Sequence, residues 1–254
     1  MVTKKVYILD GGSLVIDRSQ VLWHIDVGTP VRFPVYSVLI EHPDGLFMYD
    51  TGYDLDHVNR VLPFELPEQM PEQTIPAQLE SCGFEVADVT TLVNSHLHID
   101  HVGGNKYFAG TGTKNVLHAK ELAQARNHEP FEFFGYSDSS WDYEGASFVP
   151  VTGDFELAKG LWLYETPGHT VGHYSLLVQP ESGVKPMLFA FDVAYTAAAL
   201  DKGIQPGFHN DPVAGVRSIR RVKALAEEHG ADVFFSHDMD AWRGYKHAPD
   251  FYEA

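Results

Sequence analysis

The stretch His96-Leu97-His98-Ile99-Asp100-His101 follows directly after the apolar run Thr91-Leu92-Val93-Asn94-Ser95. It places three imidazoles and one carboxylate within one short turn, and these groups are the ligands that suit zinc and neighbouring divalent metals. Because side chains alternate along an extended chain, His96 and His98 should point the same way. Asp100 and His101 come after the strand end, where they are free to turn towards a second ion. The stretch therefore predicts a metal site at the end of a strand.

Length and composition predict an ordinary globular protein. The chain has 254 residues, of which 44% are hydrophobic and 21% charged, which is enough for one large domain with a sizeable core. No run of 18 apolar residues is present, so we expect no membrane span and no membrane partner. Without a Pro- or Ser-rich linker, we expect a single domain over residues 1–254.

The charge balance argues against nucleic acid as a partner. The chain has 35 acidic and 18 basic residues, for a net charge of −17, and such a field repels phosphate backbones unless a basic patch compensates. The nearest candidate patch is a group of basic residues on one expected helix, which we interpret as a solvated face. Its members are Arg217, Arg220, Arg221 and Lys223.

The only cysteine, Cys82, permits no disulfide within the chain, and the N-terminus lacks the apolar core of a signal peptide. Both observations favour a reducing, cytoplasmic location. Cys82 precedes Gly83 at an expected helix end, so we interpret it as a buried small hydrophobe. The sequence leaves the oligomeric state open, with a homodimer as one alternative.

Apolar, β-branched or aromatic runs bounded by Gly, Pro or Asp predict strands. Helices are expected from Thr74 to Cys82 and from Asp211 to His229, the second capped by Asp211 and ended by Gly230. Residues 127–148 are aromatic and weakly periodic, which favours a loop or lid. Strands separated by helices predict two sheets packed together and covered by helices. The expected strands are Val6–Leu9, Val35–Glu41, Leu46–Asp50, Val89–Ser95, Asn115–His118, Leu161–Thr166, Tyr174–Gln179, Pro186–Asp192 and Asp232–Ser236.

Three later residues would complete the metal site. His169 lies in the turn Thr166-Pro167-Gly168-His169-Thr170, Asp192 ends an apolar run, and His237 directly follows another. A strand-end Asp or His alone is usually a cap or turn residue. The shared placement of these three residues at strand ends favours a common metal site, because loops at strand ends converge on a rigid sheet.

This pattern resembles the metallo-β-lactamase superfamily over almost the whole chain. The resemblance implies an α/β (α+β) fold, a four-layer αββα sandwich, with two divalent metal ions, expected to be zinc, in a cleft at one sheet edge. It also implies that Asp50, in Asp50-Thr51-Gly52, orients a ligand histidine. The implied ligands are His96, His98 and His169 for the first ion, Asp100, His101 and His237 for the second, and Asp192 as the bridge.

Departures from the subfamilies narrow the function. The commonest β-lactamases place a Cys in the second-metal set and lack a histidine after the Asp, whereas this chain has His101 and its cysteine lies elsewhere. That difference argues against antibiotic hydrolysis. Transfer-RNA-processing relatives need a basic exosite, which this acidic chain does not show. Thioesterases similar to glyoxalase II share the ligand set and stay an alternative, as does a phosphodiesterase.

The segment Phe191-Asp192-Val193-Ala194-Tyr195 resembles the Asp-x-x-Tyr of the small lactonases, in which the Tyr hydroxyl faces the substrate carbonyl. These include the N-acyl homoserine lactone lactonases, which silence bacterial quorum signals. Other stretches, such as Gly103-Gly104-Asn105-Lys106-Tyr107, are similar to 4-pyridoxolactonases of vitamin B6 breakdown. We expect a small-molecule lactone as substrate, with acyl homoserine lactones slightly favoured because apolar loops would bury an acyl tail.

The resemblance implies catalytic roles for Tyr195 and Asp100. Two ions lower the pKa of a shared water, and the resulting hydroxide would attack the lactone carbonyl. Tyr195 would stabilise the developing oxyanion, and Asp100 would relay a proton to the leaving ring oxygen. The ligand set also accepts cobalt, manganese or iron.

Other residues receive plainer interpretations. We expect His173 to have a structural role or to contact the metal ligands without binding metal itself. We expect His118 and His128 to lie at a helix edge or on the surface. His209 is a weaker candidate for the substrate mouth. The remaining candidates for clamping the substrate are Trp23, Phe64, Tyr107 and the aromatic residues of 131–143.

Overall fold

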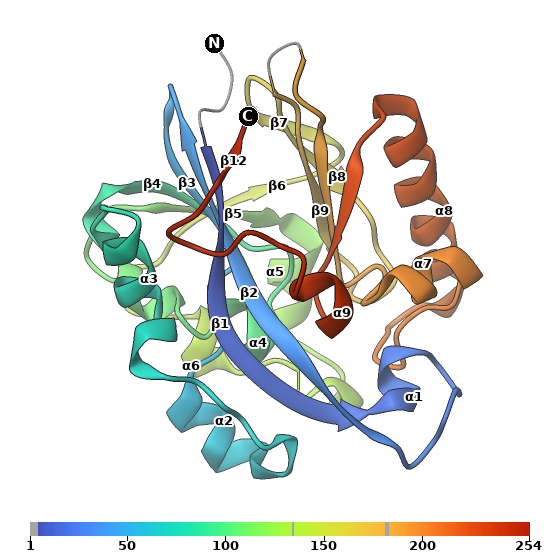
Figure 1. The fold of residues 1–254 in the computed structure, drawn as a ribbon. Coiled ribbons are helices and arrows are strands. Elements are labelled where there is room, and N and C mark those ends of the chain that lie inside the picture. Colours follow the sequence, from blue (N-terminus) through green and yellow to red (C-terminus); the bar gives the residue numbers. More distant parts are fainter. Residues whose placement is uncertain (1–4, 134, 181–182) are drawn as a thin grey trace.

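Two β-sheets pack face to face and carry helices on their outer faces (Figure 1). The computed structural model describes residues 5–133, 135–180 and 183–254. The first sheet has the strand order β12-β1-β2-β3-β4-β5-β6, and the second has the order β11-β10-β9-β8-β7. The strands are β1 Lys5–Asp17, β2 Pro30–His42, β3 Gly45–Tyr49, β4 Val89–Val93, β5 Lys114–His118, β6 Ser147–Val151, β7 Phe155–Ala158, β8 Leu161–Glu165, β9 Tyr174–Val178, β10 Met187–Phe191, β11 Asp232–Phe235 and β12 Tyr252–Glu253.

Helices connect the strands and cover the sheets. None of those in the described ranges is long and apolar enough to cross a membrane. The α-helices are α1 Arg18–Val21, α2 Leu55–Val61, α3 Ile75–Ser81, α4 Ile99–Val102, α5 Ala119–Ala125, α6 Asp138–Trp141, α7 Ala197–Lys202, α8 Pro212–His229 and α9 Met239–Trp242. Single 3₁₀ turns occur at Pro63–Glu65, Pro71–Gln73, Val86–Asp88, Asn105–Phe108 and Pro130–Glu132.

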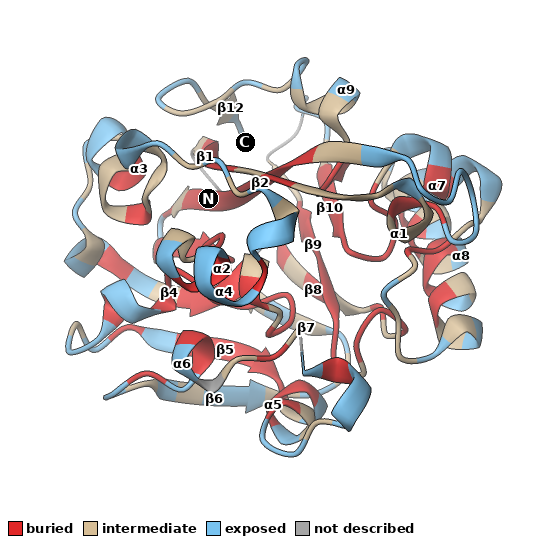
Figure 2. Cartoon of the chain, turned by 90° about the horizontal axis from the view of Figure 1, so that it is seen from below, coloured by how far each residue is buried: buried red, intermediate tan, exposed pale blue. Residues whose placement is uncertain are grey.

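Successive side chains of each strand point to opposite faces of its sheet, and this alternation produces the layers. In β1, Val6 lies in the core between the two sheets, whereas Tyr7 lies in the core beneath α3. On the other side, Leu188 of β10 packs with Ile219 of α8. Each sheet thus has two covered faces, which gives the four-layer αββα sandwich that the resemblance implies. Buried residues follow the strands, and α8 turns its exposed residues outward (Figure 2).

Helix α8 has the predicted bounds and caps. Asp211 accepts hydrogen bonds from the backbone N–H groups of Val213 and Ala214, and Gly230 ends the helix with φ of 61°. Helix α3 also lies where it was predicted, but the side chain of Thr74 does not cap it. The Thr74 hydroxyl donates instead to the carbonyl of Pro71.

Two sequence interpretations need correction. The segment 127–148 is only partly a loop, because it contains α6 and Trp141, which is 1% exposed in the core. His118 is also buried, 2% exposed, and its Nε2 lies 2.6 Å from Glu165 Oε1. His118 thus lies at a helix edge, as the N-cap of α5, which is one of the two predicted alternatives. The surface alternative was wrong, because the His118 ring packs against that of Tyr174 with centroids 5.1 Å apart.

Candidate metal centre and active site

All seven predicted ligands converge where strands end. His96 and His98 follow β4, and α4 then carries Asp100 and His101. The remaining three come from the second sheet, where His169, Asp192 and His237 follow β8, β10 and β11. Both sheets therefore contribute to one cluster, and none of the seven side chains lies apart from it.

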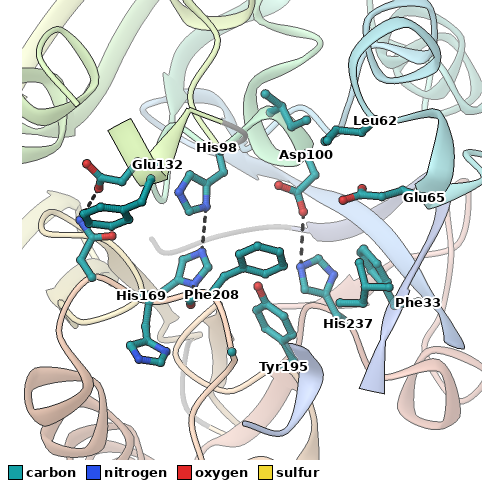
Figure 3. A pocket seen from close by; sticks show the side chains of 17 residues that line it. Phe33, Leu62, Glu65, His98, Asp100, Glu132, His169, Tyr195, Phe208 and His237 are labelled. Atoms are coloured by element: carbon teal, nitrogen blue, oxygen red, sulfur yellow. Dashed lines mark hydrogen bonds and ion pairs between the residues drawn. The ribbon is translucent and has the colours of Figure 1, made fainter. Parts of the chain in front are cut away.

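His96, His98 and His169 form one trio (the first trio). Nε2 of His169 lies 2.9 Å from Nδ1 of His98 (Figure 3). The same Nε2 lies 3.2 Å from Nε2 of His96. Zinc–nitrogen bonds of about 2.0–2.1 Å in a tetrahedral site place the ligand atoms about 3.3 Å apart. The trio therefore has the spacing of nitrogen ligands around a single ion.

Asp100, His101 and His237 form the second trio. Oδ2 of Asp100 lies 3.6 Å from Nε2 of both histidines. Asp192 lies between the two trios, with Oδ2 3.3 Å from Nε2 of His169 and 3.4 Å from Nε2 of His101. Its other oxygen, Oδ1, lies 3.4 Å from Nε2 of His237. One carboxylate thus reaches both trios, as a bridging ligand must.

The chemistry of these side chains fits divalent ions. Nε2 of His101, Nε2 of His237 and Oδ1 of Asp192 are buried polar atoms without a hydrogen-bond partner in the described structure. A buried polar atom without a partner costs free energy of folding, and a bound ion would remove this cost by coordinating the atom. Burial also lowers the pKa of His98 and of His169 to about 3, which keeps both imidazoles neutral and able to bind metal.

Hydrogen bonds behind the ligands fix the imidazole tautomers. Nδ1 of His169 donates to the carbonyl of Phe208 at 2.7 Å, and Nδ1 of His237 donates to that of Pro34 at 3.0 Å. Nδ1 of His101 lies 2.8 Å from Oδ2 of Asp50. Each of these bonds leaves Nε2 free for a metal. The placement of Asp50 agrees with the orienting role that the resemblance implies.

His98 and His173 differ from this pattern. His98 turns Nδ1 towards His169, so its Nε2 faces Gly135, where an added Cβ would lie 2.7 Å away. His173 accepts a hydrogen bond at Nε2 from the backbone N–H of Asp192, at 3.1 Å. His173 therefore supports the strand end that carries Asp192, consistent with the predicted structural role.

A cavity of about 220 Å³ opens onto the cluster. Its walls are mainly apolar, and the predicted ligands His98, Asp100, His169 and His237 form part of its lining (Figure 3). Its apolar lining residues are Ile16, Phe33, Leu62, Ile99, Phe131 and Phe208, and its other polar ones include Glu65, Glu132, His209 and Asn210.

Only some of the predicted substrate contacts reach this cavity. His209 and Phe131 line it, whereas Phe64 is 66% exposed outside it. Trp23 packs against His209 with ring centroids 4.5 Å apart, and Tyr107 borders a separate polar pocket. Phe134 lies outside the described residues. Glu65 was not predicted, because an isolated Glu in a turn carries no motif.

Tyr195 lines the cavity beside both trios. Its ring centroid lies 4.5 Å from that of His237 and 5.9 Å from that of His169. The side chain is 4% exposed, and burial holds the pKa of its hydroxyl well above the ordinary value. The hydroxyl therefore stays protonated at neutral pH, so that it can donate a hydrogen bond into the cavity (Figure 3).

Comparison with known proteins agrees with the resemblance to the metallo-β-lactamase superfamily. The model of the metallo-beta-lactamase superfamily matches residues 30–237. The N-acyl homoserine lactonase AttM of Rhizobium radiobacter is 32% identical, with 98% of each chain covered. An N-acyl homoserine lactonase of a Bacillus species is 30% identical, with 99% of this chain and 100% of the relative covered.

Solved structures extend the likeness to three dimensions. An N-acyl homoserine lactone hydrolase, with the product N-hexanoyl-L-homoserine at its catalytic metal centre, has a TM-score of 0.88 and 28% identity. That alignment covers 99% of this chain and 100% of the other. A probable metal-dependent hydrolase from Staphylococcus aureus, with a TM-score of 0.80, 15% identity and coverage of 94% and 91%, shares the fold.

Proposed function

The chain belongs to the metallo-β-lactamase superfamily, and from that premise we propose that it is a quorum-quenching lactonase, which opens N-acyl homoserine lactones with two divalent metal ions. The observation that carries the proposal is the position of Tyr195. Its protonated hydroxyl borders an apolar cavity beside two trios of metal-ligand side chains.

His96, His98 and His169 would hold one ion, Asp100, His101 and His237 would hold the other, and Asp192 would be shared. Ions held there would polarise the lactone carbonyl and lower the pKa of a water molecule. We propose zinc, because three imidazoles and a carboxylate suit it, although the same ligands accept other divalent metals.

The chain's own residues supply the remaining steps. Tyr195 donates a hydrogen bond to the carbonyl oxygen of the lactone and so stabilises the negative charge that develops there. The oxygen of the water molecule bonds to the carbonyl carbon. Asp100, which borders the same cavity, takes the proton that this water loses and passes it to the ring oxygen as the ring C–O bond breaks. The product is the open-chain hydroxy acid, and no organic cofactor is required.

The cavity walls favour an uncharged acyl lactone. Apolar side chains dominate the lining, and no Lys or Arg stands among the lining residues within the described ranges. Apart from the proposed metal ions, an anionic phosphodiester would therefore find no Lys or Arg side chain in this lining, whereas an acyl chain would bury apolar surface. The same walls favour an acyl homoserine lactone over 4-pyridoxolactone, whose polar ring has no chain to bury.

A substrate panel tests the proposal. We expect kcat/KM to be highest for acyl homoserine lactones, measured at two chain lengths, and lower for 4-pyridoxolactone, a thioester and a phosphodiester. Elemental analysis should find two divalent ions per chain. Activity on the thioester alone, or on 4-pyridoxolactone alone, would replace the proposal with that alternative.

We further propose that residues 1–254 act as one hydrolase domain, because both sheets supply ligands to the same cluster. The homodimer stays a prediction, which light scattering of the purified protein would test. The cytoplasmic location also stays a prediction.

A further inference from the structure

Glu121 is a buried carboxylate that the proposed reaction does not use. It lies on α5, and its side chain is 0% exposed. No lysine or arginine is among the groups that act on its charge in the described part of the chain, and burial raises its pKa. Burying a carboxyl group without a cationic partner is costly, so it persists only where it gains compensating hydrogen bonds.

Three donors converge on this carboxylate, and each belongs to a different segment of the site. Oε1 accepts the backbone N–H of Leu97 at 3.0 Å and the hydroxyl of Tyr136 at 2.9 Å. Oε2 accepts the backbone N–H of Gly172 at 3.0 Å. Glu121 therefore joins the turn after β4, the loop after β8 and the segment that covers His98.

Each donor lies next to a residue of the first trio. Leu97 separates His96 from His98 in the chain. The ring of Tyr136 packs on that of His98, with centroids 5.1 Å apart, and the two residues also form a backbone bridge. Gly172 belongs to the loop of His169 and meets α5 so closely that an added Cβ would lie 2.6 Å from the backbone nitrogen of Glu121.

We propose that Glu121 is a positioning residue, which holds the two loops of the first trio in register so that His96, His98 and His169 bind one ion together. No such bond links Glu121 to the second trio in the described structure, so its effect should be confined to one of the two ions. This inference rests on the proposed two-ion site.

The test is the Glu121→Gln variant, with the exposed Glu80→Gln as its matched control. Glutamine keeps the shape but turns an NH₂ group towards at least one of the three donors. Calorimetric titration of the metal-free proteins with Zn²⁺ should show two binding events in the wild type. In Glu121→Gln, one event should weaken about 10–100-fold, as for other groups that orient metal ligands, while the other stays unchanged.

A second readout needs no metal. Hydrogen exchange of the Leu97 and Gly172 amides in the metal-free protein should accelerate in Glu121→Gln but not in Glu80→Gln. If Glu121→Gln does not fold, Tyr136→Phe removes a single donor, and it should weaken the same ion to a lesser degree.

Equal weakening of both ions, or unchanged affinity for both, would overturn the positioning role. A wild-type protein that binds one ion only would overturn the two-ion proposal instead. In that case the comparison of Glu121→Gln with Glu80→Gln would still decide the role of Glu121 at that ion.

Discussion

Oδ2 of Asp50 accepts a hydrogen bond from Nδ1 of His101 at 2.8 Å, across 51 positions of the chain. The carboxylate of Asp50 also accepts hydrogen bonds from Ser95, whose backbone N–H and hydroxyl donate at 2.7 and 2.6 Å. Asp50 itself adopts φ of 56°, a left-handed conformation that is unfavourable for a residue with a Cβ. The carboxylate of Asp50 thus fixes the Nδ1–H tautomer of His101, a proposed metal ligand, and leaves its Nε2 free.

Replacing Asp50 should therefore weaken metal binding without touching a ligand. In Asp50→Asn, the side chain keeps its shape but loses the charge that favours the Nδ1–H tautomer of His101. We expect affinity for the second-trio ion to fall about 10–100-fold, as measured by titration of the metal-free protein. The exposed Asp240→Asn is the control, and equal affinities in the two variants would contradict the orienting role.

Tyr195→Phe tests the oxyanion donor. The substitution removes one hydroxyl and leaves the ring that packs against His237. Because the donated bond is strongest in the transition state, kcat should fall about 100-fold while the metal content stays at the wild-type value. Tyr164→Phe, which lies on β8 outside the cavity lining, should change kcat little. An unchanged kcat in Tyr195→Phe would remove Tyr195 from the mechanism.

Gly135→Ala tests how tightly His98 is held. The new methyl group would lie 2.6 Å from Cδ2 and 2.7 Å from Nε2 of the His98 ring. The ring has to move, and its movement would separate Nδ1 from the other atoms of the first trio. We expect weaker binding of that ion and a lower kcat. Gly244→Ala, whose nearest neighbour would be 3.4 Å away, should match the wild type in both measurements.

The sequence predicted the site better than it predicted the edges of the sheets. The predicted ligands carry strong local signals, because each lies in a segment that follows a strand. These segments follow β4, β8, β10 and β11. Strand β6 was missed because Pro150 and its mostly exposed residues are typical of an edge strand rather than a core one. Strand β12 is only two residues long, and it exists through its pairing with Lys5 and Val6, which no local pattern reveals.

The first strand was also predicted too short, because two glycines interrupt its apolar pattern. Strand β1 continues past Gly11 and Gly12 through a register shift between Asp10 and Ser13, whereas the sequence predicted a strand that ends at Leu9. Glu65 and Glu121 were missed for another reason. Both are ordinary acidic residues in short helical turns, and only tertiary packing brings one to the cavity and the other behind the ligands.

Glu65 should limit activity on long acyl chains. It lines a mainly apolar cavity and borders Phe33 and Leu62 (Figure 3), so packing an acyl tail there would remove water from a carboxyl group without replacing its hydrogen bonds. We expect Glu65→Leu to raise kcat/KM for a long unsubstituted acyl chain by about tenfold, which corresponds to about 1.4 kcal/mol. Kinetics with a short-chain lactone provide the control, and an equal rise for both chains would contradict this explanation.

Glu65 should also make the stability of the metal-free protein depend on pH. Burial, assisted by the charge of Asp100, raises its pKa to about 7, from 4.5 in the unfolded chain. Between these values the folded state holds a proton that the unfolded state has released, so the free energy of unfolding falls as the pH rises. This contribution is fully present below about pH 4.5 and is lost through pH 7.

Urea unfolding of the metal-free protein at pH 5 and pH 8 would measure that loss. Glu65→Gln cannot titrate, so its free energy of unfolding should fall less over this interval than that of the wild type. The exposed Glu72→Gln should behave like the wild type. Divalent ions beside Asp100 and His237 favour the ionised carboxylate, so loading the wild type with Zn²⁺ should shrink its difference from Glu65→Gln. Parallel pH profiles for the wild type and Glu65→Gln without metal would show that Glu65 is ionised in the folded protein throughout this range.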